Sequence, residues 1–531
     1  MTVSGSCWKS CDARTDHAYS LTLTPDMLSI INTLFKGYLG RYRRELAAHY
    51  DRPLDLQREQ LRRLLRDNRD TVIGREHNFA ALAEDPDRYA TELPVRNYDD
   101  HRPYIDRILA GEQQVLTHDA AAWIATTSGT TGSVKYLPIP QSAVGAIHLK
   151  GSWMSLAALY EKNNELEVFS HKNLLIGGAY QGIHEASGLP KADISAIIIL
   201  SIPRIMRPFY IPDVKLATAG SYEEKIEEIA HLAAREPGIT ILGGVPTWNL
   251  PLYRRILEIH GGDNMLDVWP DAAVFKHGGV NFAPYRAQFE RLFPKPGFIF
   301  QEIYNATEGF FAVQDRDDLR TMLLLLTNGI YYEFIPWRAY QRGDYAAVNL
   351  SGVRTEETYV MLISTAAGLY RYPMGDLIQF TETDPYRIVI VGRTQEFINA
   401  FGEDLLRNEA EGALMAACEA AHASVREFTV APQYIEVGAK GRHHWLVEFE
   451  QAPADMELFN RTLDAALQDR NNNYRAKRAN DFAITRHKLT VLPQGFFRQW
   501  LADRGKLGGQ HKVPRLANHR EFLEDILSRL P

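Results

Sequence analysis

The loop at residues 127–135 constrains this chain most, because it places hydroxyl groups, two glycines and a lysine between two extended segments. Glycines let several backbone N–H groups approach one anion, hydroxyls donate further hydrogen bonds, and lysine adds positive charge. Residues 121–125 predict a strand that enters the loop, and residues 136–140 predict an extended exit. The sequence therefore predicts a loop that binds polyphosphate, and an ordinary Ser/Thr/Gly surface loop is the alternative.

The spacing within this loop differs from the Walker A motif, which needs a longer spacer before a Gly-Lys-Ser/Thr triplet. A P-loop NTPase is therefore disfavoured. The loop residues that we expect to bind phosphate are Thr127, Ser128, Gly129, Thr130, Thr131, Gly132 and Lys135.

The composition indicates a globular protein of several domains. A chain of 531 residues is long enough for roughly two to four domains. The 59 basic and 66 acidic residues give a formal net charge of −7, which disfavours nucleic acid as a partner. The hydrophobic content of 45% and the charged content of 24% are ordinary for folded domains, so we expect no extended disorder.

Cysteine content and hydropathy predict a soluble cytoplasmic protein. Only three cysteines occur, too few for a disulfide framework in a chain of this size. Cys7 and Cys11 lie in a polar segment without a nearby histidine, so metal or redox chemistry there is disfavoured. No apolar run approaches the ~20 residues of a membrane-spanning helix, and the N-terminus lacks a signal-peptide pattern.

Hydrophobic periodicity divides the chain into a helical start and an α/β continuation. Residues 25–50 and 55–70 predict two helices whose apolar stripes indicate packing rather than binding. From residue 121 predicted strands alternate with helices such as residues 222–235, which favours a largely parallel sheet. The predicted strands lie at residues 173–176, 194–200, 239–242, 272–275, 298–301 and 331–335.

Residues 358–392 are different, because three apolar runs follow one another with only short turns between them. This pattern predicts an antiparallel meander. Polar turns follow, and we place a domain boundary near residues 394–399. The predicted fold class is α/β, with a large N-terminal domain at residues 1–394 that contains mixed sheets and the meander. A small α+β domain would occupy residues 395–531.

Several side chains that could take part in binding or catalysis follow predicted strands, where open α/β sheets bind ligands. Gly278 and Gly279 would let a flat ring approach the backbone, and Tyr304 offers an aromatic face. Thr307 and Glu308 add a hydroxyl and a carboxylate. Each of these has an ordinary structural alternative, as a strand-end turn, a core aromatic or a solvated charge.

Three further residues complete the candidate set. Asp376 could accept hydrogen bonds from ribose hydroxyls, or it could cap a turn. Arg393 and Lys512 could supply cations to an anionic ligand, although an isolated arginine or lysine usually belongs to the surface.

Taken together, these motifs resemble the adenylate-forming superfamily, and within it the acyl-acid amido synthetases that conjugate auxin or jasmonate to amino acids in plants. The resemblance covers nearly the whole chain. Besides the phosphate loop and the residues above, it rests on motifs at residues 93–98, 103–108, 332–336, 368–372 with 375–376, and 510–515.

The resemblance implies an N-terminal domain that binds ATP and a carboxylic acid. The loop at residues 127–135 would hold the ATP phosphates, and Gly278, Gly279 and Tyr304 would frame adenine. Asp376 would hold the ribose. By the same resemblance, Arg393 would also bind the nucleotide.

Catalysis is assigned by the same resemblance to Thr307, Glu308 and Lys512. Thr307 and Glu308 would serve the α-phosphate, and Glu308 would hold Mg²⁺. Lys512 would enter on a mobile C-terminal lid domain, and Lys506 is the rival for this role. A carboxylate that attacks the α-phosphate is an anion meeting an anion, so cations and N–H donors must neutralise the developing charge.

The sequence gives less information about which residues bind the acid. Residues 149–160, 194–202 and 245–248 are predicted to line it, with Trp153 and Trp248 in contact with the acid. Arg204 and Arg207 could meet the carboxylate of an acidic acceptor, but solvated loop charges are the favoured interpretation.

The leading functional hypothesis is ligation of a small carboxylic acid to an amine, with an amino acid as the expected acceptor. The alternatives are an acyl-CoA ligase type of enzyme with a thiol acceptor, and a nucleotide-binding regulator without turnover. ATP and Mg²⁺ are the implied cofactors. We expect no nucleic acid, membrane or obligate protein partner.

Overall fold

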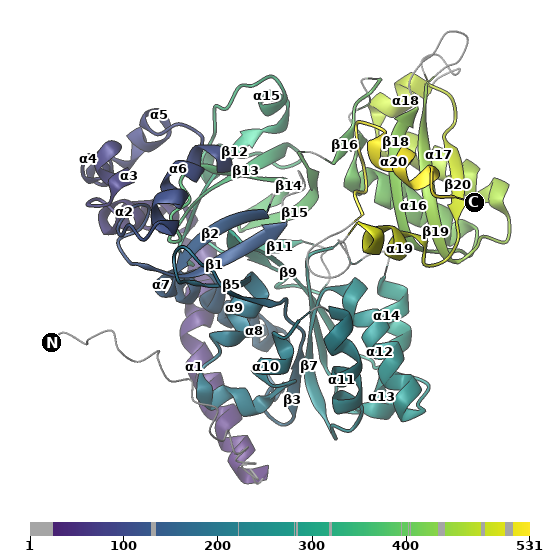
Figure 1. The fold of residues 1–531 in the computed structure, drawn as a ribbon, viewed down its shortest axis with the longest axis horizontal. Coiled ribbons are helices and arrows are strands. Elements are labelled where there is room, and N and C mark those ends of the chain that lie inside the picture. The colour runs from purple at the N-terminus through teal and green to yellow at the C-terminus, as the bar shows by residue number, and fades with distance from the viewer. Residues whose placement is uncertain are drawn as a thin grey trace.

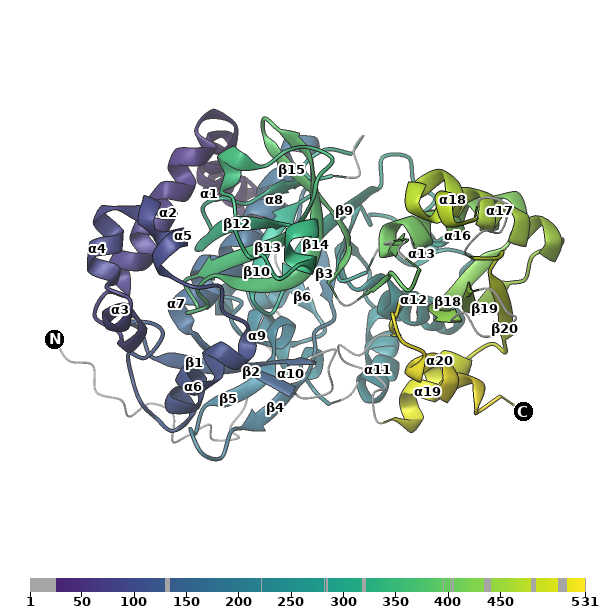
Figure 2. The same cartoon turned by 90° about the horizontal axis from the view of Figure 1, so that it is seen from above.

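The computed structural model shows a large N-terminal body and a smaller C-terminal body that begins after β15 (Tyr386–Arg393) (Figure 1). Seen from above, the two bodies lie side by side (Figure 2). The structure describes residues 25–128, 134–220, 222–280, 282, 285–317, 321–394, 396–401, 403, 405–433, 441–478, 484–504 and 513–530.

The two predicted N-terminal helices are confirmed as α1 (Pro25–Asp51) and α2 (Pro53–Asp67). Proline suits the start of α2 because its missing N–H would have no partner in the first helical turn. Both helices bury apolar side chains, including Leu39 and Leu61, in the main hydrophobic core. Helix α1 packs along α8 (Lys150–Lys162), so these helices support the sheet rather than a ligand.

An 11-stranded mixed sheet forms the centre of the N-terminal body, as the predicted fold class requires, and the predicted parallel arrangement occupies one part of it. Strands β6, β3, β7, β8 and β9 are parallel to one another. From β9 onward the neighbours are antiparallel, and the predicted meander is confirmed in β13, β14 and β15. In sheet order the strands are β12 (Ile330–Pro336), β13 (Thr358–Thr365), β14 (Tyr372–Thr383), β15, β11 (Met322–Leu324), β10 (Gly309–Val313), β9 (Ile299–Ala306), β8 (Val274–His277), β7 (Ile239–Gly244), β3 (Lys172–Leu175) and β6 (Tyr210–Ile211).

Helices cover both faces of the parallel strands. One face packs against α11 (Tyr222–Ala234), α12 (Pro246–His260) and α14 (Arg286–Leu292) through a separate apolar core that includes Phe275 and Tyr253. The opposite face packs against α8 in the main core. Ligands can therefore reach these strands only beyond their ends, which is where open α/β sheets bind them.

One predicted strand is wrong. Residues Ile194–Leu200 form helix α9, although their isoleucine-rich sequence resembles a buried strand. A short apolar run does not distinguish a buried strand from a buried helix, because both are surrounded by core on all sides. Here Asp193 ends β5 (Pro190–Asp193) and accepts a hydrogen bond from Thr126 Oγ1 at 3.1 Å, and the chain then turns into α9.

The segments that flank the predicted phosphate loop form an antiparallel pair, β1 (Ala121–Ser128) and β2 (Val134–Pro140). Thr127 pairs with Lys135 in this hairpin. The pair belongs to a four-stranded sheet with the order β2-β1-β5-β4, where β4 is Tyr180–Ile183. Both ends of the loop are thus held by strand pairing, as a phosphate-binding loop requires.

The C-terminal body is an α+β unit built on the sheet β18-β19-β20. One face carries α16 and α17 around the buried Trp445, and the other carries α19 and α20 around Leu446. These elements are β18 (Ser424–Gln433), β19 (Arg442–Gln451), β20 (Lys488–Leu492), α16 (Arg407–Ala420), α17 (Met456–Arg470), α19 (Phe496–Asp503) and α20 (Glu521–Leu527).

Apolar and polar contacts join the two bodies in the described part of the chain. Phe397 and Leu406 of the junction pack with Trp337 and Val391 of the N-terminal body. Arg254 of α12 forms an ion pair with Glu450 of β19 at 3.2 Å, and Arg515 donates to the Tyr285 hydroxyl at 3.3 Å. The short strands β16 (Phe397–Ile398) and β17 (Leu405–Leu406) lie at the junction. The boundary between residues 394 and 395 remains a prediction.

A buried charge network ties α1 to the meander and generates a stability prediction. Arg387 of β15 bonds to Asp315 at 2.6 Å, to Glu382 at 2.7 Å and to the Tyr50 hydroxyl at 3.0 Å. Arg387→Met would leave Asp315 without its counter-charge in a site where water is largely absent. We expect a loss of about 3–5 kcal/mol in the free energy of unfolding, measured by urea denaturation.

The control for this prediction is Arg255→Met. Arg255 is 40% exposed and pairs with Glu227 on the surface, so its loss should cost at most about 1 kcal/mol. Equal effects of the two substitutions would contradict the assignment of a structural role to the Arg387 network.

Candidate active site

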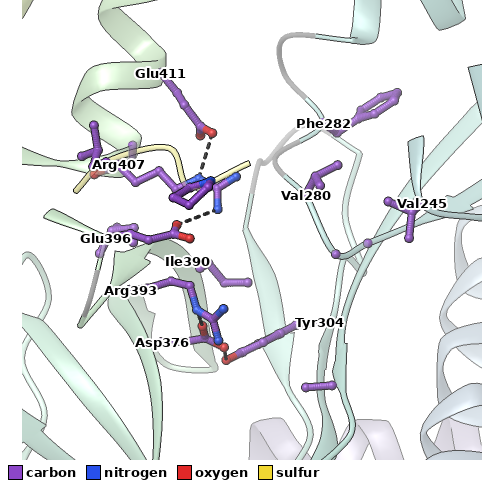
Figure 3. Close-up of a pocket in the computed structure, with 18 of the residues that line it drawn as sticks. Val245, Val280, Phe282, Tyr304, Asp376, Ile390, Arg393, Glu396, Arg407 and Glu411 are labelled. Atoms are coloured by element: carbon purple, nitrogen blue, oxygen red, sulfur yellow. Dashed lines mark hydrogen bonds and ion pairs between the residues drawn. The ribbon is translucent and has the colours of Figure 1, made fainter. Parts of the chain in front are cut away.

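A cavity of about 1430 Å³ lies between the ends of the parallel strands, the meander and the C-terminal body (Figure 3). It receives residues from elements that are distant in sequence, including β1, β9, β14 and α16. The predicted site residues that line it are Thr127, Trp248, Gly278, Gly279, Tyr304, Thr307, Glu308, Asp376 and Arg393.

Tyr304, Asp376 and Arg393 point toward one another on one wall of the cavity (Figure 3). The Tyr304 hydroxyl donates to Asp376 Oδ2 at 2.5 Å, and Arg393 Nε donates to Asp376 Oδ1 at 2.9 Å. Burial and the nearby Asp376 raise the pKa of Tyr304 well above its ordinary value, so its hydroxyl stays protonated and remains a donor. The carboxylate keeps further lone pairs that can accept from ribose hydroxyls.

Glu308 and Thr307 follow directly after β9 and border the same cavity. Burial raises the pKa of Glu308 above 4.5, and Asp376 raises it further, while Arg393 and Lys135 oppose this shift. A carboxylate whose ionised form is poorly solvated gains from a cation. Glu308 is therefore suited to a metal ion or another positive group.

The Gly278-Gly279 pair, which is predicted to let a flat ring approach the backbone, follows β8 and lies against β9. A Cβ on Gly278 would lie 2.5 Å from the Ile303 carbonyl oxygen, so no larger residue fits without moving β9. Gly279 has φ +79°, a conformation that side-chain-bearing residues rarely adopt. In Figure 3, Val280 and Phe282 lie across from Arg407 and Glu411 of the C-terminal body.

Two predicted residues lie away from the cavity wall. Trp153 of α8 packs edge-on against Phe35 and Tyr38 of α1, with ring centroids 6.0 and 6.1 Å apart. Lys135 lies on β2 with its ammonium 5.2 Å from the Tyr98 ring centroid, close enough to Glu308 to lower the pKa of that carboxyl. Trp153 therefore does not line the cavity, whereas Lys135 acts electrostatically on Glu308.

Other predicted residues lie outside the described part of the chain. These are Gly129, Thr130, Thr131, Gly132, Lys506 and Lys512, together with the side chain of Ser128. Their roles remain predictions.

The acid pocket predicted from the sequence is partly matched by the cavity. Ile194 and Ser195 of α9, together with Val245 and Trp248 at the start of α12, line it, whereas residues 149–160 do not. Arg207 donates to the carbonyl groups of residues 200 and 202 at 3.0 and 3.2 Å and lies outside the cavity, as does Arg204. The two arginines therefore act in the local loop, which agrees with the favoured interpretation.

Sequence reasoning missed two charged residues on the cavity wall, Lys276 and Glu302. Burial lowers the pKa of Lys276 to about 8 and raises the pKa of Glu302 to about 7. Each comes directly after a predicted strand, whereas the observed strands β8 and β9 continue through them. Because the predicted strands ended too early, no sequence pattern indicated that these charges lie within buried strands.

The C-terminal body contributes a second wall built on α16. Arg407 donates to Glu411 at 2.9 Å and to Glu396 at 3.2 Å, and both bonds are visible in Figure 3. Glu396 lies at the junction between the bodies, so this network holds the start of α16 against the end of the meander. Arg515, from the predicted motif at residues 510–515, pairs with Glu427 behind this wall.

Three family models match the chain in sequence order. They describe the N-terminal domain of the GH3 family (residues 43–227), its central domain (residues 323–393) and its C-terminal domain (residues 408–521). Together they span more than half of the chain, and so the chain belongs to the GH3 family.

The curated relatives match in part only. An indole-3-acetic acid-amido synthetase of Arabidopsis thaliana is 26% identical over 250 residues, which cover 43% of this chain and 40% of the relative. A jasmonoyl–L-amino acid synthetase of Oryza sativa subsp. japonica is 41% identical over 85 residues, which cover 16% of this chain and 18% of the relative. The matched region thus spans less than half the length of these relatives.

Solved structures match nearly the whole fold. The AtGH3.15 acyl acid amido synthetase in complex with 2,4-DB has a TM-score of 0.76 at 18% identity, covering 93% of this chain and 96% of that chain. A 2-hydroxyisobutyryl-CoA ligase in the postadenylation state has a TM-score of 0.55 at 12% identity, covering 94% and 92%. These similarities confirm the predicted fold class, α/β with mixed sheets and a meander in a large N-terminal part and a smaller α+β C-terminal part.

Two features are absent from the described residues. None of the described helices combines the length and apolar character needed to cross a membrane. Among the same residues, no group of three or more His, Cys, Asp or Glu side chains is arranged to hold a metal ion.

Glu302 generates a pH prediction. Because burial raises its folded pKa from 4.5 to about 7, the folded state holds this proton more tightly than the unfolded chain. The contribution of Glu302 to stability therefore falls as pH rises from 4.5 to 7, by up to about 3 kcal/mol. Glu302→Gln keeps the shape of the protonated acid and lacks this loss, so its melting temperature should exceed that of the wild type increasingly between pH 5 and about 8.

The matched control is the exposed Glu185→Gln, for which the offset from the wild type should not change across this pH range. A constant offset for Glu302→Gln would contradict the raised pKa. Differential scanning fluorimetry at fixed ionic strength is sufficient for the measurement.

Proposed function

We propose that this protein is an ATP-dependent ligase that adenylates a carboxylic acid, releases pyrophosphate and transfers the acyl group to an amine, forming an amide and AMP. The observation that carries this proposal is the convergence of Thr127, Thr307, Glu308, Tyr304 and Asp376 on one cavity. Membership of the GH3 family supports the same chemistry. The acceptor is proposed to be an amino acid, as in the names of the relatives.

The nucleotide would lie across the end of β9. Tyr304 and the Gly278-Gly279 backbone would enclose the adenine ring, and Asp376 would accept hydrogen bonds from the ribose. Arg393 already orients the Asp376 carboxylate, so less side-chain entropy is lost when the nucleotide binds. The phosphates would then point toward Thr127 and the loop that follows it.

The Glu308 carboxylate beside the proposed phosphate position suits Mg²⁺. Magnesium is usually bound through one or two carboxylates together with substrate phosphates, rather than by a cage of protein ligands. Glu308 supplies one such carboxylate, and the described residues contain no larger acidic or histidine cluster that would compete. When bound, the ion would neutralise charge on the phosphates.

In the first half-reaction the carboxylate oxygen of the acid attacks the α-phosphorus of ATP, and the bond to the β-phosphate oxygen breaks. Pyrophosphate leaves with that electron pair. The Thr307 hydroxyl, buried beside the cavity, is placed to donate to the α-phosphate as its charge grows. Lys512 is proposed to bring a further cation from the C-terminal domain.

In the second half-reaction the amine nitrogen attacks the acyl carbon, AMP leaves, and the nitrogen loses a proton. Water must be kept out between the two steps because the acyl-adenylate hydrolyses readily. We propose that the C-terminal domain acts as a lid that reorients about residues 394–399. Such a motion would let one cavity serve both half-reactions.

The finer assignments of partners and location belong to the same proposal. The substrates are proposed to be small molecules, with no obligate protein partner. A reducing cytoplasm fits the three cysteines in 531 residues.

The proposed function is tested by pyrophosphate release across a panel of carboxylic acids, with amino acids, hydroxylamine or coenzyme A as acceptors. Mass spectrometry should detect an acyl-AMP species before acceptor is added, and an amide afterwards. Turnover with coenzyme A alone would favour a thiol acceptor instead. Absence of ATP consumption with every acid would overturn the proposal in favour of a nucleotide-binding regulator.

A prediction concerns the working lysine. Lys512→Ala should slow acid-dependent pyrophosphate exchange about 100-fold while ATP binding changes little, because the cation acts mainly on charge that develops in the transition state. Lys506→Ala is the matched control and should retain exchange. The opposite pattern, with exchange lost only in Lys506→Ala, would move the role to Lys506.

A second prediction concerns the lid. Cysteines placed at Arg254 and Glu450, whose side chains meet at 3.2 Å, can be joined by a cleavable bis-thiol reagent in a background without the three native cysteines. Locking the bodies together should spare one half-reaction and abolish the other, and cleavage should restore both. Equal loss of both half-reactions would contradict domain alternation.

A further inference from the structure

Tyr98 connects the motif at residues 93–98 to the strand that leaves the phosphate loop. It is the first residue of α6 (Tyr98–Leu109), a helix that packs against β2. Its hydroxyl accepts a hydrogen bond from the Tyr136 N–H at 2.9 Å and donates to the Tyr136 carbonyl at 3.3 Å. One side chain therefore binds both backbone groups of the residue that follows Lys135.

These two bonds take the place of a neighbouring strand. β2 lies at the edge of the sheet β2-β1-β5-β4, so on its outer side no strand pairs with its backbone. Backbone N–H and C=O groups nevertheless require hydrogen-bond partners. The Tyr98 hydroxyl supplies both at Tyr136, and it thereby ties the backbone next to Lys135 to α6.

The ring of Tyr98 also contacts Lys135 itself. The Lys135 ammonium lies over this buried ring, 5.2 Å from its centroid. An aromatic face attracts a cation through its quadrupole and does not neutralise the charge. The described residues place no carboxylate in an ion pair with Lys135.

The charge of Lys135 is therefore available to a ligand. A carboxylate partner would neutralise the ammonium and compete with phosphate, whereas a ring leaves its N–H donors available to an anion. The electrostatic effect of Lys135 reaches the cavity wall, because it lowers the pKa of Glu308. Tyr98 thus holds a cation near the proposed phosphate position without consuming its charge.

Tyr98 is itself held by two further motifs to which the proposed function gives no role. Arg371, which precedes β14, donates to the Leu93 carbonyl at 2.5 Å and binds Glu333 of β12 at 3.0 Å. The Arg371 carbonyl accepts from the Arg96 N–H at 3.1 Å. The large sheet therefore fixes the segment that leads into α6, and with it the position of Tyr98.

We propose that Tyr98 is a positioning residue that prepares Lys135 for the phosphates of ATP. Its hydroxyl fixes the backbone next to Lys135, and its ring holds the Lys135 ammonium. This inference rests on the proposed function, because it takes ATP as the ligand of Lys135. Loss of Tyr98 should therefore weaken ATP binding through Lys135 and leave the affinity for the acid unchanged.

A merely structural Tyr98 would stabilise the packing of α6 on β2. Its loss would lower the melting temperature, and any effect on ATP would be the same whether or not Lys135 is present. A double-mutant cycle between Tyr98 and Lys135 separates the two roles, because a residue that acts through Lys135 loses its effect when that lysine is removed.

The experiment measures the Kd of ATP by isothermal titration calorimetry without acid, and the KM of ATP and of the acid in pyrophosphate exchange. Tyr98→Leu should raise the Kd and the KM of ATP about 5- to 30-fold, because it removes both contacts with the strand and its lysine. The KM of the acid should stay within about 2-fold of the wild-type value. In a Lys135→Met background, Tyr98→Leu should change the Kd of ATP by less than about 2-fold.

Tyr98→Phe is the conservative variant, which keeps the ring and guards against simple misfolding. It should raise the Kd of ATP less than Tyr98→Leu does, and this rise should also disappear in the Lys135→Met background. Equal effects of the two substitutions would contradict the role of the ring.

The matched control is Tyr359→Phe. The Tyr359 hydroxyl of β13 accepts from the Arg354 N–H at 2.9 Å, the same length as the bond from Tyr136 to Tyr98, but Tyr359 does not line the cavity. Loss of this comparable bond should lower the melting temperature and leave the Kd of ATP at the wild-type value.

The outcomes distinguish this inference from the proposed function. Wild-type ATP affinity in Tyr98→Leu, or equal changes with and without Lys135, would overturn the role of Tyr98 while leaving adenylation intact. Coupled loss of ATP affinity without pyrophosphate exchange for any acid would overturn the proposed function alone. Absence of ATP binding by the wild type would overturn both.

Discussion

The hydrogen bond between the Tyr304 hydroxyl and the Asp376 carboxylate, 2.5 Å long, joins two parts of the sheet on which the candidate site depends. Tyr304 belongs to the last parallel strand and Asp376 to the antiparallel meander, 72 residues later. Both groups are buried, so leaving either one unpaired would be costly. Arg393 binds the other oxygen of the same carboxylate. The wall proposed for the nucleotide is therefore fixed before a ligand arrives.

Strand direction changes at β9, which is parallel to β8 and antiparallel to β10. This change explains how one cavity collects residues from so many elements. The parallel strands present their carboxyl ends, with Gly278 and Lys276 close to the edge, and the meander returns Asp376 to that edge. Helices close both faces of the parallel part, so this edge is the place where a ligand can enter. The C-terminal body then covers it with the Arg407 network.

Much of the fold could be predicted from local sequence patterns, and the predictions that were wrong failed for physical reasons. Apolar periodicity predicted α1 and α2, and apolar runs separated by short turns predicted the meander. The strand predicted at residues 194–200 is helix α9. A short apolar run that is buried on all sides has no periodicity that would distinguish a helix from a strand. The cavity receives Trp248 but not Trp153, since one tryptophan begins a helix at the sheet edge and the other packs against α1.

The sequence by itself determined the chemical types and their order along the chain: a hydroxyl- and glycine-rich loop between strands, a Tyr-x-x-Thr-Glu run after another strand, and an aspartate in the meander. Those features depend on neighbouring residues only, which is why the family and fold class could be recognised without coordinates. Tertiary structure alone decided that Asp376 meets Tyr304 and that Lys276 and Glu302 border the cavity with shifted pKa values. Desolvation and charge contacts come from atoms distant in sequence, so no local pattern encodes them.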